Sequence, residues 1–295
     1  MASIITDLKE TFRNGNIHVR LIFINAAVFV LMAFISIFLQ LFNIAEIQLF
    51  EWLEMPASLI QFLYQPWSLL TYMFMHAGIL HILFNMLWLY WFGELFLQFF
   101  SAKHLRGLYI LGGCSGGLLY LAAYNVFPYF EPLIPYSYLL GASASVLAVV
   151  TATAYREPNY PIRLLLLGTM KLKHMAWIVI GLDLLFITSS NAGGHIAHLG
   201  GALAGLAFAA QLSKGHDLTH FINYILDTLL SWTDRQPRKP KMKVNYGKRQ
   251  SDYDYNARKK AQNEEIDRIL DKLRKSGYES LTTEEKKSLF DASKR

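Results

Sequence analysis

Residues 139–150 read LLGASASVLAVV, and residues 193–206 read GGHIAHLGGALAGL. Both stretches are apolar and rich in small residues, and each carries one polar side chain of interest, Ser143 in the first and His198 in the second. Polar residues inside membrane segments are functional candidates by default. We therefore expect the rest of the chain to bring Ser143 and His198 together in a lipid environment and to let water reach them.

Composition predicts an all-α, polytopic membrane protein. The chain has 295 residues, of which 53% are hydrophobic and 17% are charged, whereas soluble domains carry about 25% charge. The single cysteine, Cys114, excludes a disulfide within the chain and suggests no cysteine-based metal site. We expect no cofactor and no metal. We attribute the net charge of +6 to basic loops and a basic tail on the cytoplasmic side, where they would be attracted to the membrane surface. We do not take it as a sign of nucleic-acid binding.

Six apolar stretches are each near the roughly 20 residues that a helix needs to cross the hydrocarbon. The first is too long for the core of a signal peptide and shows no small-residue cleavage site, so we expect it to be retained. The six predicted spans are residues 21–42, 78–99, 105–127, 138–155, 174–190 and 194–212.

Lysine and arginine in the connections predict the orientation. Lys103 and Arg106 follow the second span, and four more basic residues lie between the fourth and fifth spans. The other three connections contain no Lys or Arg. Because positive loops face the cytoplasm, both termini are expected inside and the segment 43–68 outside.

The remainder of the chain is expected to form cytoplasmic segments. Residues 1–19 are a polar N-terminal segment, and 20–213 form the membrane domain. Apolar residues at helical spacing in 214–235 predict an amphipathic helix on the inner leaflet, with packing on a loop of the core as the alternative. A basic linker, 236–262, precedes a helical hairpin, 263–295. Gly277 would end its first helix, and Thr282 with Glu285 resembles a capping box. So small a hairpin is expected to dock on a partner.

Ser143 and His198 together suggest nucleophilic catalysis. A serine hydroxyl is a poor nucleophile unless a base takes its proton, and a histidine can then pass that proton to a leaving amine. Counted along continuous helices, each residue lies about five residues below the outer edge, or ~8 Å. The structural alternatives are a bond from Ser143 to its own helix carbonyl and a helix–helix hydrogen bond from His198.

Small residues would let the two helices approach closely. Gly194, Gly201 and Gly205 share the face of His198, and the fourth span carries a stripe of Ala144, Ala148 and Ala152.

His81 and Asn85 lie four residues apart and share a helix face. Both can donate hydrogen bonds to an oxyanion, although they could also bond to each other or to neighbouring helices. His76 lies nearer the outer loop, where a structural role is equally expected. His195 is a rival base, nearly one turn closer to the surface. Asp183 could orient a histidine, but we expect it to pair with a backbone or loop group.

Three motifs in this order resemble the rhomboid intramembrane serine proteases: His81-Ile82-Leu83-Phe84-Asn85, Gly141-Ala142-Ser143, and Ala197-His198 followed by Gly201 and Gly205. The resemblance covers about residues 16–213. It implies a six-helix core in a bacterial inner membrane, a Ser–His dyad without an acid, and cleavage of transmembrane substrates near the outer surface. By motif, Ser143 is the nucleophile and His198 the base, while His81, Asn85 and the Ser143 amide form the oxyanion hole. The terminal hairpin resembles an appendage of some bacterial rhomboids.

Three positions depart from the family pattern. Ala144 replaces a glycine after the serine, which would narrow the space near the oxyanion. Ser68 follows Trp67 where an arginine anchors the outer loop. Leu147 replaces an aromatic residue that packs on the histidine, so the orientation of His198 must come from elsewhere.

Two other functions are alternatives to a protease. A catalytically silent relative would bind and escort transmembrane helices, but such relatives usually lack the serine or the histidine. A small transporter or channel would be expected to show interrupted segments in an inverted repeat, and none is evident.

Overall fold

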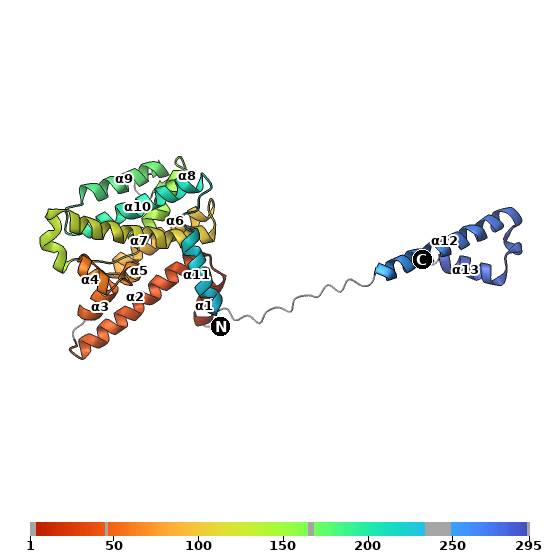
Figure 1. The fold of residues 1–295 in the computed structure, drawn as a ribbon, viewed down its shortest axis with the longest axis horizontal. Coiled ribbons are helices and arrows are strands. Elements are labelled where there is room, and N and C mark those ends of the chain that lie inside the picture. Colours follow the sequence, from red (N-terminus) through yellow and green to blue (C-terminus); the bar gives the residue numbers. More distant parts are fainter. Residues whose placement is uncertain (1–3, 45–46, 165–167, 234–248, 294–295) are drawn as a thin grey trace. The chain divides into compact units, whose positions relative to one another are not determined.

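The computed structural model describes residues 4–44, 47–164, 168–233 and 249–293. The chain divides into two compact units, Met1–Asp234 and Arg235–Arg295 (Figure 1).

The first unit is mostly helical. Among its described residues, four helices are long and apolar enough to cross a membrane, namely α2, α6, α7 and α10. The helices of this unit are α1 (Ile4–Asn14), α2 (Ile17–Leu41), α3 (Ile47–Leu53), α4 (Leu59–Tyr64), α5 (Ser68–Thr71), α6 (Ile79–Leu97), α7 (Ala102–Val126), α8 (Ser143–Arg156), α9 (Leu172–Leu185), α10 (Ala192–Leu212) and α11 (His220–Thr233).

The helices of the fourth and fifth predicted spans are too short by themselves to cross the hydrocarbon core. Helices α8 and α9 have 14 residues each, about 21 Å of helix against a hydrocarbon core of roughly 30 Å. Two small sheets were not predicted. In the first, β1 (Met55–Pro56) pairs with β2 (Tyr138–Leu139), and in the second β3 (Pro161–Leu164) pairs with β4 (Gly168–Lys171).

Helix α8 begins at Ser143, not at residue 138, which corrects the predicted fourth span. Tyr138 and Leu139 are extended and pair with β1. Gly141 then has a φ of +123° and donates its N–H to the Tyr72 carbonyl. A φ in this range is unfavourable for residues with a side chain. The helical count of depth therefore does not apply to Ser143, because the five residues before it are not a helix.

Small residues let α10 pack closely on both α7 and α8, and α9, α10 and α7 run alongside one another (Figure 1). A Cβ on Gly201 would collide with the Ala144 carbonyl, and one on Gly205 with the Ala148 carbonyl. These contacts confirm the predicted small-residue faces of α8 and α10. Gly116 of α7 adds a contact that was not predicted, since a Cβ there would lie 2.6 Å from the Ala144 methyl.

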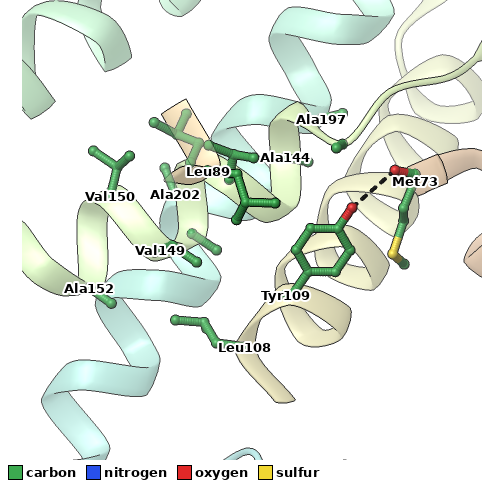
Figure 2. Close-up of a cluster of buried hydrophobic side chains, with 14 of the residues drawn as sticks. Met73, Leu89, Leu108, Tyr109, Ala144, Val149, Val150, Ala152, Ala197 and Ala202 are labelled. Atoms are coloured by element: carbon green, nitrogen blue, oxygen red, sulfur yellow. Dashed lines mark hydrogen bonds between the residues drawn. The ribbon is translucent and has the colours of Figure 1, made fainter. Parts of the chain in front are cut away.

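The core lies where these helices meet, and Figure 2 shows part of it. Ala144, Ala197 and Ala202 lie between α8 and α10, with Leu89 of α6 beside them. The hydroxyl of the fully buried Tyr109 donates to the Met73 carbonyl at 3.2 Å. This bond ties α7 to the segment that leads into α6.

The segment 47–71 is anchored without an arginine. Gln65 donates to the carbonyls of Glu51 and Glu54 at 3.0 and 3.3 Å. Trp67 donates to the Trp52 carbonyl at 2.8 Å, and Thr71 to the Leu53 carbonyl at 2.6 Å. Ser68, which stands where the family pattern has an arginine, is fully buried. Side-chain bonds to backbone carbonyls thus anchor the segment at the place where the resemblance leads us to expect an arginine.

Helix α11 packs its polar side on the first turns of α7. Asn223 accepts from Arg106 at 2.9 Å, and Asp227 pairs with both Lys103 and Arg106 at 2.8 and 2.7 Å. Phe221 and other apolar side chains of α11 are exposed. The alternative prediction was packing on a loop of the core, whereas the structure packs α11 on helix α7 and leaves its apolar face exposed.

The second unit contains α12 (Arg249–Ser276) and α13 (Thr283–Ser293). Gly277, with a φ of +78°, ends α12 as predicted. The capping box is confirmed by two bonds between Thr282 and Glu285, of 2.8 and 3.3 Å. The predicted linker is partly wrong because residues 249–262 are helical. Its remaining residues, 236–248, lie outside the described residues.

Candidate active site

The four predicted site residues line one cavity of about 340 Å³. His81 and Asn85 come from α6, Ser143 from α8 and His198 from α10. A second cavity of about 490 Å³ shares His81 with the first and is lined by several tyrosines, including Tyr138. The shared lining makes the second cavity a candidate route for water.

Ser143 owes its position to the start of α8. As the first residue of the helix, it has no helical carbonyl one turn earlier to accept from its hydroxyl, so the predicted structural alternative does not arise. The first N–H groups of a helix lack intrahelical partners and lie at the positive end of its dipole. The Ser143 amide can therefore donate to an anion that forms beside its own hydroxyl.

His198 is held by an acid. Its Nδ1 lies 2.9 Å from Oδ1 of Asp183 in α9. The expectation that Asp183 pairs with a backbone or loop group is therefore wrong. Its carboxylate instead joins α9 to α10, where it also meets His195 Nδ1 at 2.8 Å. Within the described residues no hydrogen bond joins His198 to Ser143. Such catalytic bonds are often long before substrate binds.

His81 has one ring nitrogen close to Gly141, two residues before the serine. The Ala77 N–H donates to His81 Nδ1 at 3.4 Å, which favours the tautomer with hydrogen on Nε2. A Cβ built on Gly141 would lie 2.9 Å from that Nε2 and 3.7 Å from Ser143 Oγ. The missing side chain of Gly141 thus leaves room for the His81 ring, which lines the same cavity as Ser143.

Asn85 is partly engaged within its own helix. Its Nδ2 donates to the His81 carbonyl at 2.9 Å, which is one of the structural alternatives. An amide nitrogen carries two hydrogens, so one remains for a ligand in the cavity that Asn85 lines.

Three other polar residues near the predicted site, Ser145, His195 and His76, do not line the cavity. Ser145 is fully buried, and its hydroxyl faces Gly113 of α7. His195 bonds Asp183 but is not part of the lining. His76 stacks edge-on against His81, with ring centroids 5.1 Å apart. Burial and the neighbouring His81 ring lower the pKa of His76 to about 4, so it is neutral near pH 7.

The departures from the family pattern have different consequences. The methyl group of Ala144 faces Gly116 and is absent from the cavity lining. The expected narrowing of the oxyanion site by Ala144 therefore does not occur. Leu147 lines the cavity but is not aromatic. The bond to Asp183 therefore supplies the orientation that Leu147 cannot give to His198.

Asp183, His195 and His198 are also a group that could hold a metal ion, with ligand atoms within 4.8 Å of one another. The distances favour hydrogen bonds. An oxygen and a nitrogen bound to one tetrahedral zinc at about 2.0–2.1 Å would be separated by roughly 3.3 Å. The observed separations from Asp183 Oδ1 are 2.8 and 2.9 Å.

Comparison with known proteins gives two family matches. The rhomboid domain model matches residues 63–215, and a family of unknown function, DUF6576, matches 250–295. RHOMBOID-like protein 12, mitochondrial, of Arabidopsis thaliana is 32% identical over 165 residues, which are 50% of this chain and 47% of that protein. Rhomboid protease GlpG of Yersinia pseudotuberculosis is 26% identical over 181 residues, 61% of this chain and 60% of that protein. The chain thus spans about half to three fifths of these relatives.

Proposed function

Because this chain belongs to the rhomboid family, we propose that it is an intramembrane serine protease that hydrolyses peptide bonds in or near transmembrane segments of other proteins. The observation that carries the proposal is the single cavity lined by Ser143, His198, His81 and Asn85. One nucleophile, one base and two donors are the groups that acyl transfer requires. The rhomboid protease relatives add support from sequence.

Ser143 Oγ attacks the scissile carbonyl carbon, and its proton passes to His198 Nε2, the ring nitrogen that Asp183 leaves free. The carbonyl oxygen becomes an oxyanion. Donors for it are the Ser143 amide, His81 Nε2–H and the second amide hydrogen of Asn85. Collapse of the intermediate breaks the C–N bond, and His198 returns the proton to the leaving amine. A water molecule, activated by the same imidazole, then hydrolyses the acyl-enzyme.

The proposed topology has six spans and cytoplasmic termini. Four helices meet the length and composition of a span. For α8 and α9 the support is their packing against α10. Basic residues at the start of α7, in the 156–173 connection and in the tail all agree with this orientation. The protein would then be a multi-pass protein of a bacterial inner membrane whose active site opens to the outer face.

The proposed segments follow from this topology. Residues 20–213 are the membrane domain, and α11 lies on the inner leaflet with Phe221 and Tyr224 in lipid, since both are exposed. The terminal hairpin would be free to bind a cytoplasmic partner.

The deciding experiment compares two serines. We expect purified wild-type protein in proteoliposomes to cleave a transmembrane substrate and to react with a fluorophosphonate probe. Ser143→Ala should lose both activities. Ser145→Ala is the matched control and should keep them, because Ser145 faces α7. Activity that survives in Ser143→Ala and disappears in Ser145→Ala would reject this nucleophile.

A further inference from the structure

A buried acid in α9 bonds two histidines of α10. Asp183 is 4% exposed. Its Oδ1 lies 2.8 Å from His195 Nδ1 and 2.9 Å from His198 Nδ1. A carboxylate buried in a low-dielectric interior is costly unless it is paired and hydrogen-bonded. The two histidines pair Oδ1, whereas Oδ2 is buried without a hydrogen-bond partner among the described residues. The bond to His198 places the acid directly behind the predicted base.

These bonds constrain the imidazole chemistry. An ionised carboxylate can only accept hydrogen bonds. Each Nδ1 that bonds Asp183 must therefore carry hydrogen, which leaves the lone pair of His198 on Nε2. That is the nitrogen available to the cavity, and a base there must be able to accept the Ser143 proton. The opposite tautomer would present an N–H and could not act as the base.

We propose that Asp183 is a positioning residue that fixes the tautomer and orientation of His198 and stabilises the imidazolium formed during the reaction. The inference rests on the proposed protease function. It changes the expected dyad into a three-residue arrangement of Ser143, His198 and Asp183. Loss of the acid from such arrangements leaves the wrong tautomer in place and lowers kcat strongly.

The other groups around His198 support this assignment. Leu147 lines the same cavity and offers no aromatic face for the ring. His81 lies across the cavity and has its own partner, the Ala77 N–H. His195 competes for Asp183 Oδ1, but its ring also packs on Phe186, with centroids 5.9 Å apart. We therefore assign His195 to the support of Asp183 and not to the reaction.

The test is Asp183→Asn, with His195→Gln as the matched control, because both variants remove one partner from the same cluster. For Asp183→Asn we expect kcat to fall on the order of 10²- to 10⁴-fold, with KM within about twofold of wild type. For His195→Gln we expect kcat within about tenfold of wild type. A merely structural role for Asp183 would lower the melting temperature of both variants and reduce active protein without this split.

A second measurement needs no acid variant. In wild-type protein labelled with ¹⁵N-histidine, NMR should show His198 protonated at Nδ1, with the signal assigned by its loss in His198→Gln. A wild-type His198 protonated only at Nε2 would overturn the inference even if Asp183→Asn does not fold. Full kcat in Asp183→Asn, or a stoichiometric divalent metal in the purified wild type, would also overturn it.

If the proposed protease function is wrong, the experiments give a different result from a failure of the Asp183 inference. In that case wild-type protein and Ser143→Ala would behave alike towards the fluorophosphonate probe and the substrate. The NMR result would still report whether Asp183 sets the tautomer of His198.

Discussion

The Nε2 atom of His81 lies 2.9 Å from where a Cβ on Gly141 would be placed. The predicted oxyanion donor therefore occupies space that only a glycine two residues before the nucleophile leaves open. The same glycine has a φ of +123°, so both the backbone and the packing require a residue without a side chain.

We expect Gly141→Ala to lose activity and stability together. The new methyl group would displace the His81 ring, and the backbone would be strained by about 1–3 kcal/mol. Substrate turnover and a thermal melt in detergent measure the two effects. Gly181→Ala is the control, since a Cβ at Gly181 meets nothing within 4 Å. A fully active Gly141→Ala would show that His81 need not approach this closely.

Asn85→Ala should lower kcat on the order of 10²- to 10³-fold, as the loss of one well-placed oxyanion donor does. KM should change little, because the developing charge exists only in the transition state. The Ser143 amide and His81 would remain, so probe labelling should still be measurable. His81→Ala should combine a lower kcat with a lower melting temperature, because loss of the larger ring opens a cavity. An unchanged kcat in Asn85→Ala would make that residue structural.

The orientation can be tested with an impermeant thiol reagent. In a Cys114→Ala background, Ser190→Cys between α9 and α10 should react from outside intact cells. Lys214→Cys beyond α10 should react only after the membrane is opened. Both positions are exposed. The opposite labelling pattern would place the active site on the cytoplasmic side.

The hairpin should lose stability in acid. Lys272, together with the Thr282 N–H and hydroxyl, lowers the pKa of Glu285 to about 2 from an ordinary value of 4.5. A carboxyl group whose pKa is lower in the folded state stabilises that state at pH values above its unfolded-state pKa. This stabilisation is lost as the pH falls towards the folded-state pKa. Amide exchange of residues 278–293 in the full chain should therefore quicken as pH falls from about 4.5 to about 2, after correction for intrinsic rates. Glu285→Gln should weaken this pH dependence, whereas Glu284→Gln, at an exposed neighbour, should not.

Local patterns predicted much of the fold. Apolar length identified the helices that can span a membrane, since hydropathy is read within a window of about 20 residues. The end of α12 at Gly277 and the cap formed by Thr282 and Glu285 depend on neighbours within one turn. The small faces of Gly201 and Ala144 follow from helical spacing. The residue types of the candidate site were likewise visible from motif and spacing.

Contacts between distant segments account for what was missed. Helix α8 starts at Ser143 because β2 pairs with β1, some 80 residues earlier, and because Gly141 bonds Tyr72. The sequence around Asp183 could not identify its partner, because any polar group within reach could satisfy a buried carboxylate.

The sequence by itself determined the four helices that are long and apolar enough to cross a membrane among the described residues, the small-residue faces, and the presence of Ser143, His81, Asn85 and His198. Those features depend on side-chain chemistry and on periodicity within single helices. Only the tertiary structure decided where α8 begins and that Asp183 stands behind His198. Both depend on backbone pairing and burial between segments, and the free energy of burying an acid is settled only by the groups that surround it.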